Sequence, residues 1–236
     1  MRRPEVRRGI ALRGAWLVLA LVLAAAPVRG EATATAPAAV RLGPGSVLWL
    51  LGTSNVHDFE SRTTAPVVKL LRDASAGDPT DVAALDAWLR AGGLKGLDLD
   101  VPLSTLHSER SGLDKNMLKA LRAEQNPAIT FHLTRARVGG ASGDSIAVSA
   151  DGVLRVAGRE RPITVAGHLL RSEAGVWLNG SHGLRMSEYD VKPPTMMLGA
   201  LRVRDTVTVH FRLLLVPGAP SGGSAAETRS TERNTP

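Results

Sequence analysis

The stretch that decides the fold class is TVTVHFRLLL, residues 206–215, in which apolar and polar side chains alternate. Val207, Val209, Phe211 and Leu213 fall on one phase, and threonine, histidine and arginine fall on the other. Because successive side chains of a β-strand point to opposite faces, a period of two predicts a strand with one buried and one solvated face. Such strands are typical of antiparallel sheets.

The same alternation recurs elsewhere in the chain. It is found in residues 97–104 and 129–134. Other short apolar runs are separated by glycine-containing turn signals, Ala150-Asp-Gly152 and Asn179-Gly180, both of which predict tight hairpins because glycine readily adopts positive φ. Several short strands joined by turns predict a sandwich or a closed barrel.

Two segments have helical character. Residues 114–123 are rich in helix formers, Ser111 or Asp114 can cap their start, and Pro127 prevents continuation. Residues 81–90 place apolar side chains at helical spacing, although the same stretch could extend a sheet. The predicted fold is therefore mainly β, with one or two short helices.

The first thirty residues predict export. Five arginines precede an apolar run at residues 15–26, and small residues with a proline follow. This order is typical of a secretory signal peptide, and the run is shorter than the roughly 20 apolar residues of a membrane span. We therefore expect residues 1–30 to be removed, a periplasmic or secreted location, and no stable membrane insertion afterwards.

Charge and cysteine content exclude several functional classes. Removal of the six arginines and one glutamate in residues 1–30 lowers the formal net charge from +7 to +2, and the remaining basic residues are scattered, which argues against a nucleic-acid partner. The chain has no cysteine, so disulfides, thiolate metal sites and a cysteine nucleophile are excluded.

Composition also predicts the boundaries of the folded part. Residues 31–45 are predicted to be a linker, 46–216 a single folded domain, and 217–236 a disordered tail of glycine, serine, threonine, proline and charged residues.

No catalytic or metal-binding residue is predicted. Ser54 lies near His57-Asp58, but the segment lacks the second glycine of a nucleophile elbow, and a turn in which these side chains satisfy backbone groups is the favoured interpretation. The six histidines form no His-x-His or i, i+4 pair. We expect neither an enzyme nor a cofactor, and a metal site assembled across strands is disfavoured.

Four segments resemble a known family. They are GTSNVHDF at residues 52–59, VPLSTL at 101–106 with LDKNM at 113–117, NPAITF at 126–131 with GRERPI at 158–163, and MSEYDVKPPTMMLG at 186–199. In order and spacing they resemble the YceI-like family, which implies an antiparallel, lipocalin-like β-barrel. Relatives in this family enclose a long apolar cavity that holds polyisoprenoid or other lipid-like molecules.

The resemblance implies a non-enzymatic, exported binding protein for an apolar lipid or isoprenoid-type small molecule. Alternation shows which residues point inward but not how much space they leave, so a packed barrel acting as an extracytoplasmic stress or interaction module is the alternative. The residues after the double proline Pro193-Pro194 line the cavity mouth or plug one end, and a homodimer is left open. The candidate lining residues are Leu99, Val101, Ile129, Phe131, Val165, Leu169, Met196, Met197, Val209 and Phe211.

Overall fold

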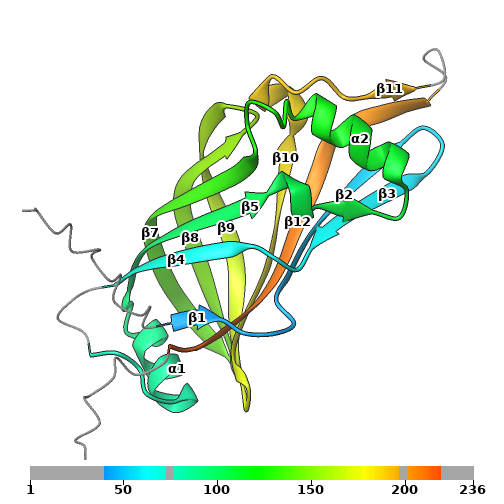
Figure 1. Ribbon diagram of the computed structural model, residues 1–236. Coiled ribbons are helices and arrows are strands. Elements are labelled where there is room, and N and C mark those ends of the chain that lie inside the picture. Colours follow the sequence, from blue (N-terminus) through cyan, green and yellow to red (C-terminus); the bar gives the residue numbers. More distant parts are fainter. Residues whose placement is uncertain (1–39, 73–76, 197–200, 219–236) are drawn as a thin grey trace, which may run out of the picture. The chain divides into compact units, whose positions relative to one another are not determined.

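The alternating segments form an antiparallel sheet that curls into a barrel (Figure 1). In the computed structural model, which describes residues 40–72, 77–196 and 201–218, ten strands follow the path β4-β5-β7-β8-β9-β10-β12-β2-β3-β6, and β1 and β11 each pair with β12. The prediction of a mainly β, lipocalin-like barrel with one or two short helices is confirmed. The strands are β1 (Val40–Leu42), β2 (Val47–Ser54), β3 (Asp58–Thr63), β4 (Val67–Arg72), β5 (Leu94–Pro102), β6 (His107–Ser108), β7 (Ala128–Ser142), β8 (Ser145–Val156), β9 (Arg159–Ser172), β10 (Gly175–Arg185), β11 (Thr195–Met196) and β12 (Leu201–Pro217).

The two ends of the strand path meet at a bent seam. β5 continues through the 3-10 turn η1 (Leu103–Thr105) into β6, which pairs with β3, and β3 continues into β4, which pairs with β5. The hydroxyls of Thr63 and Thr105 lie 2.8 Å apart at this bend. Because the Thr105 hydroxyl donates to the carbonyl of Pro102, Thr63 is the donor between the two threonines. The seam is therefore closed by hydrogen bonds between two continuous, bent strands.

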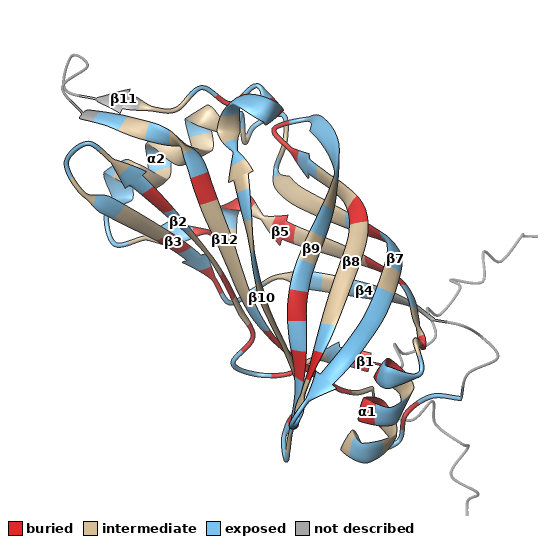
Figure 2. Ribbon diagram, turned by 180° about the vertical axis from the view of Figure 1, so that it is seen from behind, coloured by how far each residue is buried: buried red, intermediate tan, exposed pale blue. Residues whose placement is uncertain are grey.

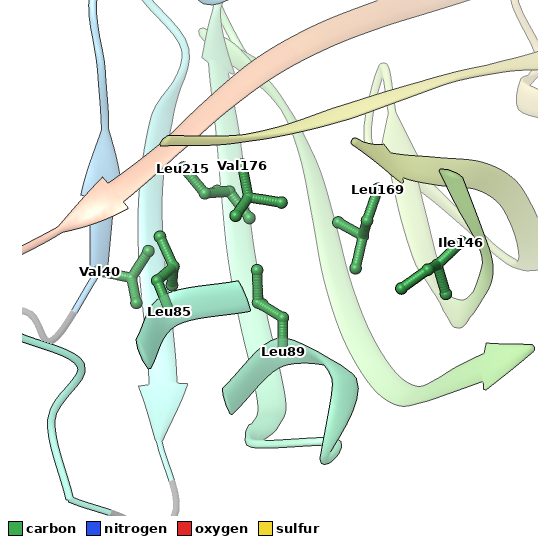
Figure 3. Close-up of a cluster of buried hydrophobic side chains, with 7 residues drawn as sticks. All are labelled: Val40, Leu85, Leu89, Ile146, Leu169, Val176 and Leu215. Carbon is green, nitrogen blue, oxygen red and sulfur yellow. The ribbon is translucent and has the colours of Figure 1, made fainter. Parts of the chain in front are cut away.

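Helix α1 (Val82–Arg90) packs against the barrel and confirms the helical prediction for residues 81–90. The Asp81 carboxylate caps it by accepting a hydrogen bond from the backbone N–H of Ala84 at 2.8 Å. Its apolar face is completely covered, since Leu85 is 0% and Leu89 5% exposed. They belong to a core cluster with Val40, Ile146, Leu169, Val176 and Leu215 (Figure 3).

Helix α2 (Ser111–Ala120) also confirms a helical prediction, but its start differs from the one expected. The N-cap position is Arg110, with no capping side-chain hydrogen bond. Asp114 instead accepts hydrogen bonds from the backbone N–H and the hydroxyl of Ser108, at 2.8 and 2.6 Å. Its carboxylate is thus used to attach α2 to β6 and is not available as a cap.

Both predicted hairpins at glycines are wrong. β8 runs through Gly152 and β10 runs through Gly180 without a break. The β8–β9 reversal instead lies at Ala157-Gly158, where both residues have positive φ, 49° and 83°. Such a pair of conformations is typical of a type I′ turn. Gly152 and Gly180 serve another purpose, because the rings of Phe131 and Phe211 occupy the space where their side chains would lie.

The described residues all belong to the compact unit Ala36–Pro236. The predicted signal peptide, most of the predicted linker and residues 219–236 of the predicted tail lie outside the described residues. Residues 40–42, which were assigned to the linker, form β1 and pair with the end of β12. The folded part therefore begins earlier than residue 46. No described helix is long and apolar enough to span a membrane.

Candidate functional site: an apolar cavity inside the barrel

The interior of the barrel is hollow. A cavity of about 320 Å³ is bounded by the inward-facing residues of β2, β3, β5, β7, β8, β9, β10 and β12 and by residues of both helices. This volume falls within the range of about 300–1,000 Å³ typical of small-molecule sites. The inward residues of the strands therefore border open space and do not pack completely against one another.

Eight of the ten predicted lining residues border this cavity. They come from β5, β7, β9 and β12, in agreement with the inward phase of the alternating pattern. Met196 forms a backbone pair with Leu201, but its side chain and the whole of Met197 lie outside the described residues. The eight residues are Leu99, Val101, Ile129, Phe131, Val165, Leu169, Val209 and Phe211.

Helix α2 supplies a part of the wall that the sequence did not assign to the site. Its residues Leu113 and Met117 and its C-cap residue Leu121 border the cavity, and none of the helix residues is fully buried. The spacing of the apolar residues predicted this helix, but the sequence did not predict where the helix packs. Figure 1 places α2 across the barrel end opposite to α1. We call these the α2 end and the α1 end.

Burial differs between these two ends. In Figure 2 buried residues gather where β9 and β10 approach α1, and further buried positions lie along β5, β8 and β12. Near the α2 end a smaller core cluster of Val156, Ala157, Tyr189 and Val191 packs beside Leu121. Burial of the Tyr189 hydroxyl, together with the nearby charge of Glu188, raises its pKa above the ordinary value. Tyr189 is therefore a neutral part of this wall.

Polar side chains are rare in the cavity wall. Among the described residues they are Ser61, Asn116, Arg137, Ser149, His182 and Tyr189. Arg137 is paired with Asp151, with 2.6 Å between Nη2 and Oδ2, and this hydrogen bond, with one from Thr164, lowers the pKa of Asp151. The charge of Arg137 is thus balanced outside the lumen.

His182 is the histidine among these polar groups. It occupies an inward position of β10 between Gly180 and Leu184 and lies opposite Val209 of β12. Within the described part of the chain its imidazole has no hydrogen-bond or ion-pair partner. It can therefore donate or accept one hydrogen bond with a group inside the cavity.

The Ser54–His57 segment is a turn, as favoured from the sequence. The Ser54 hydroxyl donates to the carbonyl of His57 at 2.7 Å and accepts from the backbone N–H groups of Val56 and His57. The His57 ring lies 3.3 Å from a guanidinium nitrogen of Arg110. The serine oxygen is used by its own turn, and among the described residues no three His, Asp or Glu side chains gather as a metal site.

The comparison with known families agrees with the geometry. The model of the family described as "YceI-like domain" matches residues 55–215, most of the chain. The chain belongs to the YceI-like family. Its cavity thus lies in a recognised domain type, and the resemblance drawn from the four sequence segments is confirmed.

Solved structures show the same fold as this YceI-like chain. One is BcnA of Burkholderia cenocepacia, 14% identical, with a TM-score of 0.53, covering 72% of this chain and 95% of that one. Another is a polyisoprenoid binding domain from Saccharophagus degradans implicated in plant cell wall breakdown, 13% identical, with a TM-score of 0.55, covering 77% of this chain and 99% of that one. At these identities the likeness establishes the YceI-like fold alone. No curated protein matches the sequence.

Proposed function

We propose that this YceI-like protein is an exported, non-enzymatic binding protein that holds a polyisoprenoid or other long apolar lipid-like molecule in its cavity. The observation that carries the proposal is the hollow, almost entirely apolar interior. An empty apolar space of this size leaves its lining without contact partners, and burial of an apolar ligand there gains about 25 cal/mol per Å² of surface removed from water.

The polar groups of the wall support a ligand with one polar head on a long apolar chain. His182 is the group best suited to hydrogen-bond a hydroxyl or carbonyl oxygen, because it faces the cavity without a partner in the described structure. The surrounding residues on β10 and β12, Leu184, Val207 and Val209, are apolar and would contact the chain. A structural neighbour is described as a polyisoprenoid binding domain, which is consistent with this class of ligand.

The packed-barrel alternative is less well supported, because it requires a solid interior. An enzymatic role is also less well supported, since the only serine–histidine neighbours considered from the sequence, Ser54 and His57, are engaged in a turn. The export part of the proposal rests on the signal-like composition of residues 1–30. Fractionation and N-terminal sequencing of the mature protein test it directly.

The decisive experiment is native mass spectrometry of the protein purified from the periplasm, followed by solvent extraction and identification of the released molecule. We expect a stoichiometric, long-chain isoprenoid or other lipid. The same spectrum counts subunits and tests for a homodimer. If the protein carries no ligand and binds no added prenol or quinone, the binding proposal is wrong.

A matched pair of variants on β9 ties binding to the cavity. Val165→Trp places a large ring in the lumen, whereas His168→Trp places it on the exposed face of the same strand. We expect Val165→Trp to lose at least about 10-fold in affinity for an added prenol, since filling a pocket by even one methylene changes affinity by that order. His168→Trp should bind as the wild type does. Equal binding by both variants would place the ligand elsewhere.

A further inference from the structure

All three phenylalanines of the chain border the cavity, and each lies over a glycine of a neighbouring strand. A Cβ atom added to Gly52 would lie 2.1 Å from Cζ of Phe59. The corresponding distances are 2.4 Å from Gly152 to Cζ of Phe131 and 2.3 Å from Gly180 to Cζ of Phe211. These distances are far shorter than a carbon–carbon van der Waals contact of about 3.5–4.0 Å, so each ring occupies the place of the missing side chain.

The three glycines stand at inward positions of their strands. Gly52 continues the inward phase of Leu48 and Leu50 on β2, and Gly180 lies between Leu178 and His182 in the inward phase of β10. Gly152 lies two residues before Leu154, in the inward phase of β8. An inward glycine removes one side chain from the wall, and the ring from the adjacent strand fills that gap.

The pairing register explains how the rings reach these gaps. Phe59 of β3 is directly opposite Gly52 of β2, and Phe211 of β12 is directly opposite Gly180 of β10. Phe131 of β7 is opposite Leu154, two residues from Gly152 on β8. Directly opposite and diagonal residues are both within reach of an aromatic side chain. Pairs of this kind occur on three separate parts of the barrel wall.

We propose that Gly52, Gly152 and Gly180 hold the three rings against the barrel wall and thereby set the cross-section of the cavity. With a side chain at the glycine position, the ring would have to turn into the lumen. A methyl-branched polyisoprenoid chain has a larger cross-section than a linear alkyl chain, so the three pairs adapt the cavity to branched chains. This specificity claim rests on the proposed function, but the position of the rings does not.

Gly52 is the site at which this idea can be tested cleanly. The three atoms nearest to its added Cβ all belong to the Phe59 ring, and no backbone atom is among them. At Gly152 and Gly180 the added Cβ would also lie 2.5 Å from a backbone oxygen, of His132 and Ala166 respectively, so alanine there would disturb the strands themselves. Gly183 on β10 is the matched control, because a Cβ there meets nothing within 4 Å.

The experiment compares wild type, Gly52→Ala and Gly183→Ala for binding of geranylgeraniol, which is branched, and hexadecanol, which is linear, by displacement of 1-anilinonaphthalene-8-sulfonate. We expect Gly52→Ala to lose about 10-fold in affinity for geranylgeraniol and much less for hexadecanol, consistent with the steric discrimination of a filled pocket. Gly183→Ala should match the wild type. The double variant Gly52→Ala/Phe59→Leu, which removes the colliding ring, should regain binding of geranylgeraniol.

The outcomes separate this inference from the proposed function. If wild type binds neither alcohol nor any other added lipid, the proposed function is wrong. If wild type binds and Gly52→Ala keeps the affinities of Gly183→Ala, the inference is wrong. A crystal structure of Gly52→Ala gives a ligand-independent answer: the Phe59 ring is expected in the lumen, and an unmoved ring overturns the inference. If Gly52→Ala fails to fold, Phe59→Trp replaces it in the experiment. The larger ring narrows the cavity at the same point while Gly52 is kept, and the same loss of affinity for geranylgeraniol is expected.

Discussion

The helices at the two ends of the barrel are of similar length but pack in opposite ways. α1 has nine residues and buries Leu85, Asp86 and Leu89, whereas α2 has ten residues and buries none. α1 packs its apolar face into a core formed with residues of β1, β8, β9, β10 and β12, as Figure 3 shows. α2 borders the cavity with Leu113 and Met117, and its C-cap residue Leu121 does so too.

This difference shows how one sheet provides both stability and a binding space. At the α1 end, the inward residues of the strands meet a helix and exclude solvent. At the α2 end, the residues of the helix that border the cavity, Leu113 and Met117, are only partly buried. Because regions with few buried apolar contacts open most readily, we expect the α2 end to be the more mobile part and the route by which a ligand enters.

The largest effect is expected on the free energy of unfolding when one apolar residue of each helix is replaced by alanine. Leu85→Ala removes a side chain that is 0% exposed and should lower the free energy of unfolding by about 3–5 kcal/mol, because the cavity it leaves adds to the lost transfer energy. Leu113→Ala at the α2 end should cost about 1 kcal/mol or less, since Leu113 already borders empty space. Urea denaturation measures both. Equal losses would show that the α2 end is as tightly packed as the α1 end.

Ligand binding should reduce the difference in mobility between α1 and α2. This effect should be smaller than the loss of stability caused by Leu85→Ala. A ligand at 100 times its Kd stabilises the bound state by about 2.7 kcal/mol. We expect amide hydrogen exchange in α2 to slow when geranylgeraniol is added, while exchange in α1, which is already packed, changes little. Added protection confined to α1 would argue that the ligand does not occupy the cavity below α2.

The smallest effect concerns the attachment of α2 to β6. Desolvation opposes ionisation of Asp114, but hydrogen bonds from the hydroxyl and backbone N–H of Ser108, with a contribution from His107, lower its pKa below the ordinary value. A lowered folded-state pKa stabilises the protein above the unfolded value of about 3.9, and this stabilisation is lost as pH falls through the folded pKa. Asp114→Asn should therefore cost about 1 kcal/mol at neutral pH and progressively less below pH about 4.

Denaturant titrations of wild type and Asp114→Asn between neutral and acidic pH test this dependence. Glu124→Gln, at an exposed position after α2, serves as the control and should show no such convergence. A difference between wild type and Asp114→Asn that stays constant down to acidic pH would mean that the Ser108–Asp114 contacts do not depend on the charge of Asp114.

Local patterns predicted the strands and the inward residues well because they depend on period alone. Residues 206–215 are part of β12, and the odd-numbered apolar residues of this stretch border the cavity, as do Ile129, Phe131 and Leu133 of β7. The glycine signals were misleading because glycine serves two different needs. At Gly158 it permits positive φ in a turn, whereas at Gly152 and Gly180 it makes room for a ring supplied by another strand. Only the partner across the sheet distinguishes these two cases.

The sequence by itself determined the fold class, the family, the helical segments and the side chains of β5, β7, β9 and β12 that point inward. Those properties follow from the period of the pattern and from local motifs. Tertiary structure alone decided that α1 is buried against the barrel while α2 is not, that α2 forms part of the cavity wall, and that His182 borders the cavity without a partner among the described residues. These features depend on which surfaces meet across the barrel, and a pattern of inward and outward residues carries no information about the distance between opposite walls.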